Sequence, residues 1–132
     1  MKIYRFETDD GRGPYKYDLQ LIWNGNFNCD PSKCPTPERD ERLAPEWNSV
    51  RHLSLHYKFG FISEDQVMSW FPTNTRRLLI EAGIKLRIYH VDESDVIQGD
   101  TQCVFKHRWA VLVEELHPVT LESLCQFDKK SA

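Results

Sequence analysis

The sequence predicts an α+β fold: a single compact domain with a mixed or antiparallel sheet and two to four short helices. Three segments alternate apolar and polar residues as strands do, and two adjacent segments between them carry a helical apolar stripe. Strands and helices come in separate blocks rather than in regular alternation, which is typical of α+β domains. The 132 residues are enough for one domain with its own core.

The N-terminal third predicts one strand followed by irregular structure. Residues 2–7, "KIYRFE", alternate in the manner of a strand, and the loop signal "DDGRGPY" follows. Residues 24–50 are rich in loop formers, and Pro31, Pro35, Pro37 and Pro45 all lie there. Long loops inside compact domains are usually functional, so residues 24–50 are expected to form a lid or specificity region.

The middle of the chain predicts a strand and two helices. "HYKFGFIS" reads as the strand, and Ser63 with Gln66 has the spacing of a capping box for the helix that follows. Pro72 ends this helix. "TNTRRLLIEAG" predicts a second helix, with Gly83 at its C-terminal cap.

The C-terminal third predicts three strands and a helix. "IKLRIYHV" alternates cleanly, and "QCVF", the turn "KHR" and "WAVLVEEL" are expected to form a hairpin. The apolar run from Trp109 to Val113 predicts a strand covered on both faces. A final helix is expected from Thr120, and residues 128–132 are expected to be a frayed tail.

Composition excludes several classes of protein. Seventeen basic and twenty acidic residues give a net charge of −3, which provides no general attraction to nucleic acid, although a local patch is compatible with it. No apolar run approaches the roughly 20 residues that span a bilayer. The N-terminus is too charged for a secretory signal, so the four cysteines are expected to be reduced in a cytoplasm.

Three segments together resemble the ADP-ribosyltransferase fold in a small, divergent form. They are the strand "IYRFE", the aromatic strand "YKFGFIS" leading into "EDQVMSWF", and the strand, polar loop and hairpin "LRIYHVDESDVIQGDTQCVFKHRWAVLVEEL". The chain is also similar to small phage and prophage proteins with "YR…GPY", an aromatic "GF-S…WF" and "V..G..Q.VF". "VDESDVI" is similar to a segment of phage anti-CRISPR proteins of the ADP-ribosyltransferase type.

The resemblance implies an NAD site. Arg5 matches the arginine that contacts the ribose or phosphate of NAD, and Ser63 matches the serine that supports the catalytic corner. Gln102 stands where the family usually has a glutamate, and an amide there supplies no negative charge for the transition state. The other residues that the resemblance places at NAD are Tyr4, Gly13, Tyr15 and Phe61.

Each candidate also has a structural interpretation. Arg5 fits a surface ion pair on an edge strand, and Ser63 is explained by helix capping. Gln102 stands at the entrance of the expected hairpin, where any polar residue would be tolerated. The aromatic residues Phe59, Phe61, Trp70 and Phe71 fit a core. The mixed-charge run "ERDER", Glu38–Arg42, predicts a solvated face or part of a binding lid.

A zinc site is a further alternative. Cys29, Cys34, His52 and His56 have the residue types and approximate spacing of a structural site. Against this, the histidines lie in an apparent strand, where side chains four residues apart are roughly 13 Å from each other. No metal is therefore expected.

The functional expectation that the resemblance implies is NAD-dependent ADP-ribosyl transfer onto a host or defence component, in the cytoplasm of the host cell. Gln102 puts this enzymatic activity in question. Two alternatives stay open: a non-catalytic inhibitor that binds a host defence protein, as anti-CRISPR proteins do, and a small zinc-stabilised interaction module. No membrane partner and no general nucleic-acid partner is expected.

Overall fold

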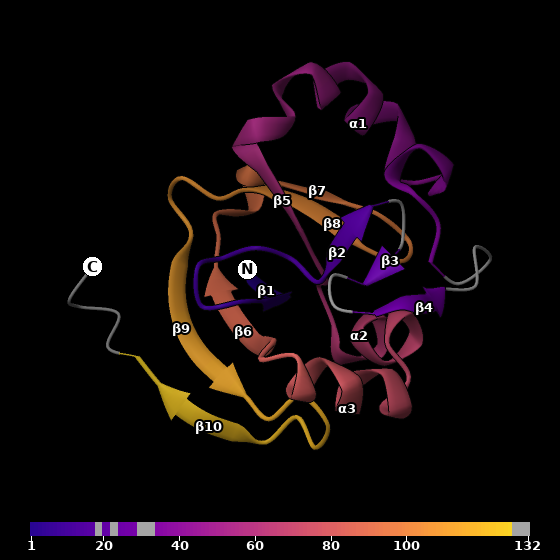
Figure 1. Ribbon diagram of the computed structural model, residues 1–132. Helices are drawn as coiled ribbons and strands as arrows, with labels where there is room; N and C mark the ends of the chain where they lie inside the picture. Colours follow the sequence, from indigo (N-terminus) through magenta and orange to yellow (C-terminus); the bar gives the residue numbers. More distant parts are fainter. Residues whose placement is uncertain (18–19, 22–23, 29–33, 128–132) are drawn as a thin grey trace.

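Two antiparallel sheets form the centre of the fold in the computed structural model, which describes residues 1–17, 20–21, 24–28 and 34–127 (Figure 1). The four-stranded sheet has the order β1 (Lys2–Glu7), β6 (Lys85–His90), β9 (Val111–Leu116) and β10 (Ser123–Gln126). The three-stranded sheet has the order β5 (Tyr57–Gly60), β8 (Cys103–Lys106) and β7 (Val96–Gln98). An isolated bridge between Tyr4 and Phe61 joins the two sheets.

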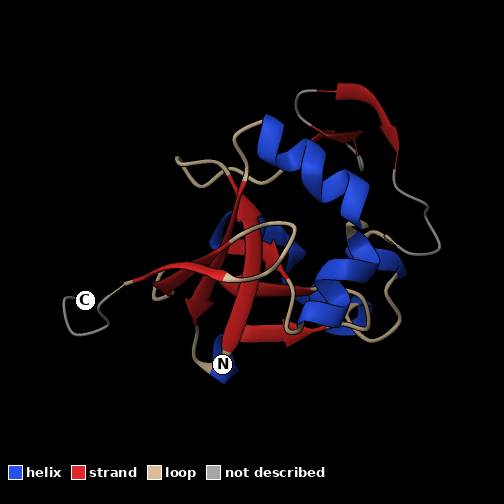
Figure 2. Cartoon of the chain, turned by 90° about the horizontal axis from the view of Figure 1, so that it is seen from below, coloured by secondary structure: helices blue, strands red, loops and turns tan. Residues whose placement is uncertain are grey.

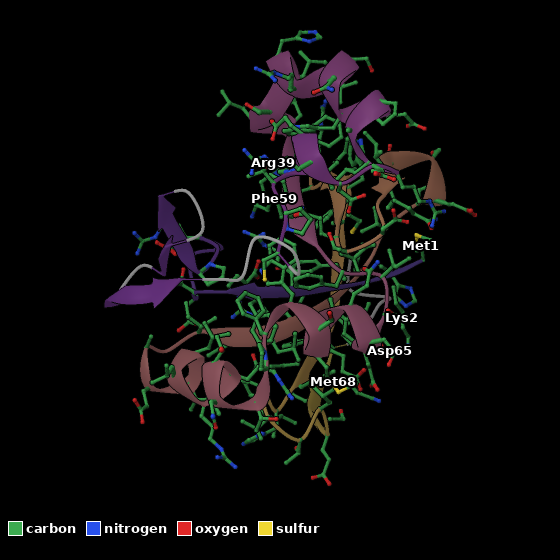
Figure 3. The ribbon with its side chains drawn as sticks, turned by 90° about the vertical axis from the view of Figure 1, so that its right-hand side faces the viewer. Met1, Lys2, Arg39, Phe59, Asp65 and Met68 are labelled. Atoms are coloured by element: carbon green, nitrogen blue, oxygen red, sulfur yellow. The ribbon has the colours of Figure 1, made fainter. Side chains whose placement is uncertain are left out.

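Helices cover the outer face of each sheet. The helices are α1 (Ala44–Val50), α2 (Glu64–Trp70) and α3 (Thr73–Glu81), with 3-10 turns η1 (Pro37–Arg39), η2 (Arg51–His56) and η3 (Glu93–Asp95). Figures 1 and 3 show α1 at one end of the molecule and α2 and α3 toward the other, with most of the strands between them. A small third sheet of β2 (Tyr15–Tyr17), β3 (Gln20–Leu21) and β4 (Asn24–Asn28) lies at the periphery (Figure 2).

The alternation in β1 and β6 explains the layers. Phe6, Leu86 and Ile88 point to one side of the four-stranded sheet and pack with residues of α2 and α3. Ile3 points to the other side, where it packs with Phe105 of the three-stranded sheet. Successive strand residues face opposite sides of a sheet, so each strand contributes to two cores.

A third core lies between the three-stranded sheet and α1. Val104 of β8 packs there with Leu43 and Trp47. The ring of Trp47 meets the ring of Tyr57 edge-on, with the ring centres 6.1 Å apart. Helix α1 therefore belongs to the fold, inside the segment 24–50 that was predicted to be a loop-rich lid.

Gly60 allows the two sheets to approach each other. A Cβ atom there would lie 2.6 Å from Cγ2 of Ile3 and 2.9 Å from the carbonyl oxygen of Tyr4. Any side chain would push β5 away from β1, since contacts this short do not occur between unstrained atoms.

The predicted α+β class, the antiparallel pairing and the number of helices are confirmed. So are the strand at residues 2–7, the strand that begins near residue 57, and both central helices. Ser63 caps α2 by accepting a hydrogen bond from the Gln66 backbone N–H at 3.2 Å. The Gln66 side chain accepts from the N–H of Ile62 rather than from that of Ser63, so the capping box forms one residue out of its usual register.

The predicted C-terminal hairpin is wrong. β8 pairs with β5 and β7, whereas β9 pairs with β6 and β10, so the two segments lie in different sheets. The N–H of His107 still bonds the carbonyl of His56 at 3.3 Å, which continues the pairing of β8 with β5, and residues 107–110 then connect β8 to β9 in the other sheet. Trp109 is consequently 70% exposed rather than covered on both faces.

The predicted final helix is also wrong. Leu121 has φ +63°, a left-handed conformation that interrupts a helix. The next residues form strand β10 against the edge of β9. The predicted frayed tail, residues 128–132, lies outside the described residues.

Replacing Ser63 by alanine is expected to lower the free energy of unfolding by about 1 kcal/mol, because α2 loses the acceptor for an N-terminal N–H group. Urea denaturation monitored by tryptophan fluorescence measures the change. Ser54→Ala in the exposed turn η2 is the matched control and should change the free energy by less than about 0.5 kcal/mol. Equal effects of the two substitutions would contradict the capping role.

Candidate functional site

A cluster of charged side chains lies on the inner face of the four-stranded sheet. Arg5 of β1 stands opposite Arg87 of β6, an arrangement of like charges that is unfavourable by itself. Glu7 lies between them: Oε1 accepts from Nε of Arg5 at 2.8 Å and Oε2 from Nη1 of Arg87 at 3.0 Å. The Tyr89 hydroxyl also donates to Glu7. One carboxylate thus neutralises two facing guanidinium groups.

The Arg5 side chain has all three of its nitrogens engaged. Besides Glu7, Nη1 donates to the carbonyl of Phe59 at 2.7 Å and Nη2 to the carbonyl of Gly11 at 3.0 Å. The side chains of Arg5 and Glu7 are 8% and 1% exposed. Arg5 therefore ties β1 to β5 and to the loop that follows β1.

Arg87 connects the buried cluster to the surface. Its Nη2 donates to Asp9 at 3.0 Å, and Asp9 also pairs with Lys85 at 2.8 Å. Nε of Arg87 lies 3.7 Å from a carboxylate oxygen of Glu115. Within the described part of the chain, this Nε is a buried side-chain nitrogen that makes no hydrogen bond.

The cluster keeps Glu7 ionised. Burial raises the pKa of Glu7, but hydrogen bonds from Tyr89 and Arg87 and the charge of Arg5 outweigh it, so the net pKa is lowered. Burial and the neighbouring Glu7 carboxylate together raise the pKa of Tyr89, which keeps its hydroxyl protonated as a donor.

A second buried carboxylate organises the loop before β8. Asp40 accepts from the backbone N–H groups of Leu43 at 3.1 Å, Asp100 at 3.0 Å and Thr101 at 2.9 Å, and from the Thr101 hydroxyl at 2.8 Å. Burial raises the pKa of Asp40, but the hydrogen bonds from these N–H groups and from the Thr101 hydroxyl lower it by more. The net pKa is therefore below the ordinary value. A Cβ atom on Gly99 would lie 2.6 Å from Oδ2 of Asp40, which explains the glycine.

The burial of Asp40 corrects the prediction for the segment "ERDER" at this one residue. Asp40 is 2% exposed and holds a distant loop, whereas the run was predicted to be a solvated face or part of a binding lid. Glu38 also has a structural contact, since it accepts from the indole N–H of Trp47 at 3.0 Å.

Stability is expected to fall in acid because of these two carboxylates. Their folded-state pKa values lie below the ordinary 4.5 of Glu7 and 3.8 of Asp40, so the folded state binds fewer protons than the unfolded state in this range. The stabilisation is complete above pH about 5 and is lost as the pH falls through the folded-state values. Thermal unfolding between pH 7 and pH 2 measures this loss. A Glu7→Gln, Asp40→Asn double variant should show a flatter pH profile, and an unchanged profile would contradict the assignment.

Four of the predicted site residues form two separate groups, Gly13 with Arg5 and Ser63 with Gln102. Gly13 lies against Arg5, since a Cβ atom on it would be 3.5 Å from Nη2 of Arg5. Ser63 is linked through Gln66 to the loop before Gln102, because the Gln66 amide donates to the carbonyls of Gly99 at 3.3 Å and Asp100 at 3.2 Å. The Gln102 amide donates to the carbonyl of Pro35 at 2.8 Å. Arg5 and Gln102 thus have separate sets of partners.

The remaining predicted residues lie in the core or beyond the described side chains. Tyr4 and Phe61 are bridged through their backbones, with both hydrogen bonds at 2.8 Å. Phe61 is buried and its ring centre is 5.7 Å from that of Trp70, which agrees with the core interpretation. Tyr15 lies in β2, and its side chain is outside the described part of the structure.

Among the described residues, the cysteine and histidines of the zinc alternative do not form a cluster. Cys34 is buried and donates to the carbonyl of Trp70 at 3.4 Å, whereas His52 and His56 are exposed on η2. Their segment is a 3-10 turn, so the predicted strand over the histidines is wrong. Cys29 lies outside the described residues. No cluster of three or more potential metal-binding side chains occurs among the residues described.

A surface missed by sequence reasoning lies where η2 meets the β8–β9 turn. We call it the basic–apolar corner and define it by Arg51–His56 and Lys106–Trp109. Nε2 of His107 lies 3.0 Å from the carbonyl oxygen of Leu55, which places the two segments side by side. Leu55 is 90% and Trp109 70% exposed. The segments "RHLSLH" and "KHRW" carry no acidic residue, a local charge pattern that could have marked them.

Comparison with known proteins places the chain in a family. The family model described as "Bacteriophage T4 Y00F protein" matches residues 1–119. The chain belongs to this family. It is 38% identical over 106 residues to the "Uncharacterized 19.7 kDa protein in motB-dexA intergenic region" of Enterobacteria phage T4. The match covers 80% of this chain and 61% of that relative, so the chain spans about three fifths of the relative's length.

The predicted similarity to small phage proteins is therefore confirmed. The likeness to ADP-ribosyltransferases stays a prediction, because no solved structure matches the chain. In the described residues, no helix is both long and apolar enough to cross a membrane.

Proposed function

We propose that this phage protein acts by binding a bacterial protein in a stable complex, without NAD chemistry. The observation that carries the proposal is the basic–apolar corner. Leu55 and Trp109 project from adjacent segments and are largely exposed. Contiguous exposed apolar side chains are a mark of protein–protein contact sites, and tryptophan is enriched among the residues that dominate binding energy.

The contacts of Arg5 and Gln102 support a structural role for these two residues, which the resemblance assigns to the NAD site. A ligand phosphate would have to displace Glu7 and two backbone carbonyls from the Arg5 guanidinium. Breaking a buried ion pair typically costs about 3–5 kcal/mol. Gln102, the proposed ribose contact, donates its amide to Pro35. ADP-ribosyl transfer is therefore the alternative against which binding is tested.

The test is affinity capture from an enterobacterial lysate with the tagged full chain. The expected result is a protein retained in roughly equimolar amount by the wild type and lost with a Leu55→Ser, Trp109→Ser double variant. Leu124→Ser is the matched control, since Leu124 is exposed on β10 away from the corner, and it should retain the protein. Thermal unfolding midpoints of all three proteins verify that they fold.

Nicotinamide release and the thermal shift with NAD are measured on the same samples. No release and no shift are expected. Turnover that Gln102→Glu raises, together with no retained protein, would overturn the proposal in favour of ADP-ribosyl transfer.

A further inference from the structure

We infer that the basic–apolar corner docks onto an acidic protein surface that also offers an apolar contact. This inference rests on the proposed function and specifies the chemistry of the partner. Arg51, Lys106 and Arg108 are exposed in the corner, and His52, His56 and His107 lie beside them. The chain as a whole has net charge −3, so the corner has the opposite sign from the rest of the molecule.

The two segments of the corner are joined to each other and to the sheet beneath them. The His107 N–H bonds the carbonyl of His56 at 3.3 Å, and Tyr57 pairs with Lys106 across β5 and β8. Beneath it, Trp47 of α1 packs on Tyr57. Figure 1 shows the turn η2 and the β8–β9 connection at the same end of the molecule as α1. The backbone of the corner is held in place by these contacts, so binding of a partner orders mainly the exposed side chains.

The exposed side chains of the corner are not needed by the fold. The core under it is formed by Leu43, Trp47 and Val104, and both Leu55 and Trp109 point away from that core into solvent. Arg51 has a long contact with Glu38 at 4.0 Å, between side chains that are 60% and 42% exposed. An exposed pair at this distance contributes little to stability, so the charge of Arg51 remains available to a partner.

The side-chain types favour a protein over a nucleic acid. Leucine has no aromatic face for a base, yet Leu55 is the most exposed large apolar residue described. The Arg108 guanidinium lies 4.8 Å from the centre of the Trp109 ring, so one face of that ring is already occupied. Single-stranded nucleic acids are bound by rows of open aromatic faces along a basic groove. An exposed tryptophan with an arginine against it instead matches the residue types that dominate binding energy at protein interfaces.

The experiment compares three fluorescent probes by anisotropy with the purified full chain. They are an amphipathic helical peptide of glutamate and leucine of about 20 residues, polyglutamate of similar length, and single-stranded oligothymidylate of about 20 nucleotides. The expected order of affinity is the amphipathic peptide first, by at least about tenfold over each of the others. Binding should weaken as the salt concentration rises from about 50 mM to about 300 mM, because screening shortens the range of charge attraction.

Variants then assign the contact to the corner. A Lys106→Glu, Arg108→Glu double variant and the Leu55→Ser variant should each reduce affinity for the amphipathic peptide by about tenfold or more. Arg77→Glu, an exposed arginine on α3, is the matched charge control and should leave the affinity within about twofold of wild type.

Each other outcome overturns the inference. Tighter binding of oligothymidylate would identify the corner as a nucleic-acid site. Equal binding of polyglutamate and the amphipathic peptide would show that the partner needs no apolar contact. Binding that does not depend on salt concentration would show that the partner surface need not be acidic. If the anisotropy experiment fails but a protein is still captured from the lysate through Leu55 and Trp109, only the acidic nature of the partner is refuted. If the capture experiment fails as well, the proposed function is also refuted.

Discussion

Replacing Glu7 by alanine is expected to lower the free energy of unfolding by about 3–5 kcal/mol, the usual cost of removing one partner from a buried ion pair. Arg5 and Arg87 would then face each other across β1 and β6 without a counter-charge. Their side chains are 8% and 13% exposed, so water can compensate only in part. Urea denaturation at neutral pH, followed by tryptophan fluorescence and by far-UV circular dichroism, measures the loss.

Two controls separate charge from hydrogen bonding. Glu7→Gln keeps an acceptor oxygen but no charge and should have an intermediate effect. Asp10→Ala removes an exposed ion pair with Arg12 at 3.1 Å and should change the free energy by less than about 1 kcal/mol. If Glu7→Ala proved as mild as Asp10→Ala, the cluster would be hydrated, and Arg5 would again be a candidate for binding a ligand phosphate.

Replacing Asp40 by alanine is expected to lower the free energy of unfolding by about 3 kcal/mol, since hydrogen bonds to a charged acceptor contribute about 1.5–3 kcal/mol each and are not additive. The change leaves the N–H groups of Leu43, Asp100 and Thr101 without their acceptor. Two segments that lie 60 residues apart in sequence would lose their link. Hydrogen exchange of the Asp100 and Thr101 amides should accelerate more than exchange in β6.

The matched control is Asp100→Ala in the same loop. Its side chain is exposed, and the backbone N–H that bonds Asp40 is retained. This variant should change the free energy of unfolding by less than about 0.5 kcal/mol. Equal losses for Asp40→Ala and Asp100→Ala would show that loop charge, rather than the buried acceptor, provides the stability.

The sequence alone determined the elements whose signals are local. The alternation in "KIYRFE" and "IKLRIYHV" placed β1 and β6 correctly, because residues on alternate faces must enter different cores. Ser63, Pro72 and Gly83 marked the ends of α2 and α3, because capping and backbone geometry depend on a few neighbouring residues. The match to the phage family agrees with the similarity to small phage proteins that was drawn from short motifs.

Only the tertiary structure decided how distant segments meet. The run "CVFKHRWAVLVEEL" has the local pattern of a hairpin, yet β8 pairs with β5 and β9 pairs with β6, both distant in sequence, and the two strands join different sheets. Arg5 is fixed by Glu7 and by the carbonyl of Phe59, 54 residues away, so its surroundings could not be read from its own strand. Burial and long-range hydrogen bonding select among pairings that local propensity leaves equivalent. That selection enclosed Arg5 and Asp40 and left Leu55 and Trp109 in solvent.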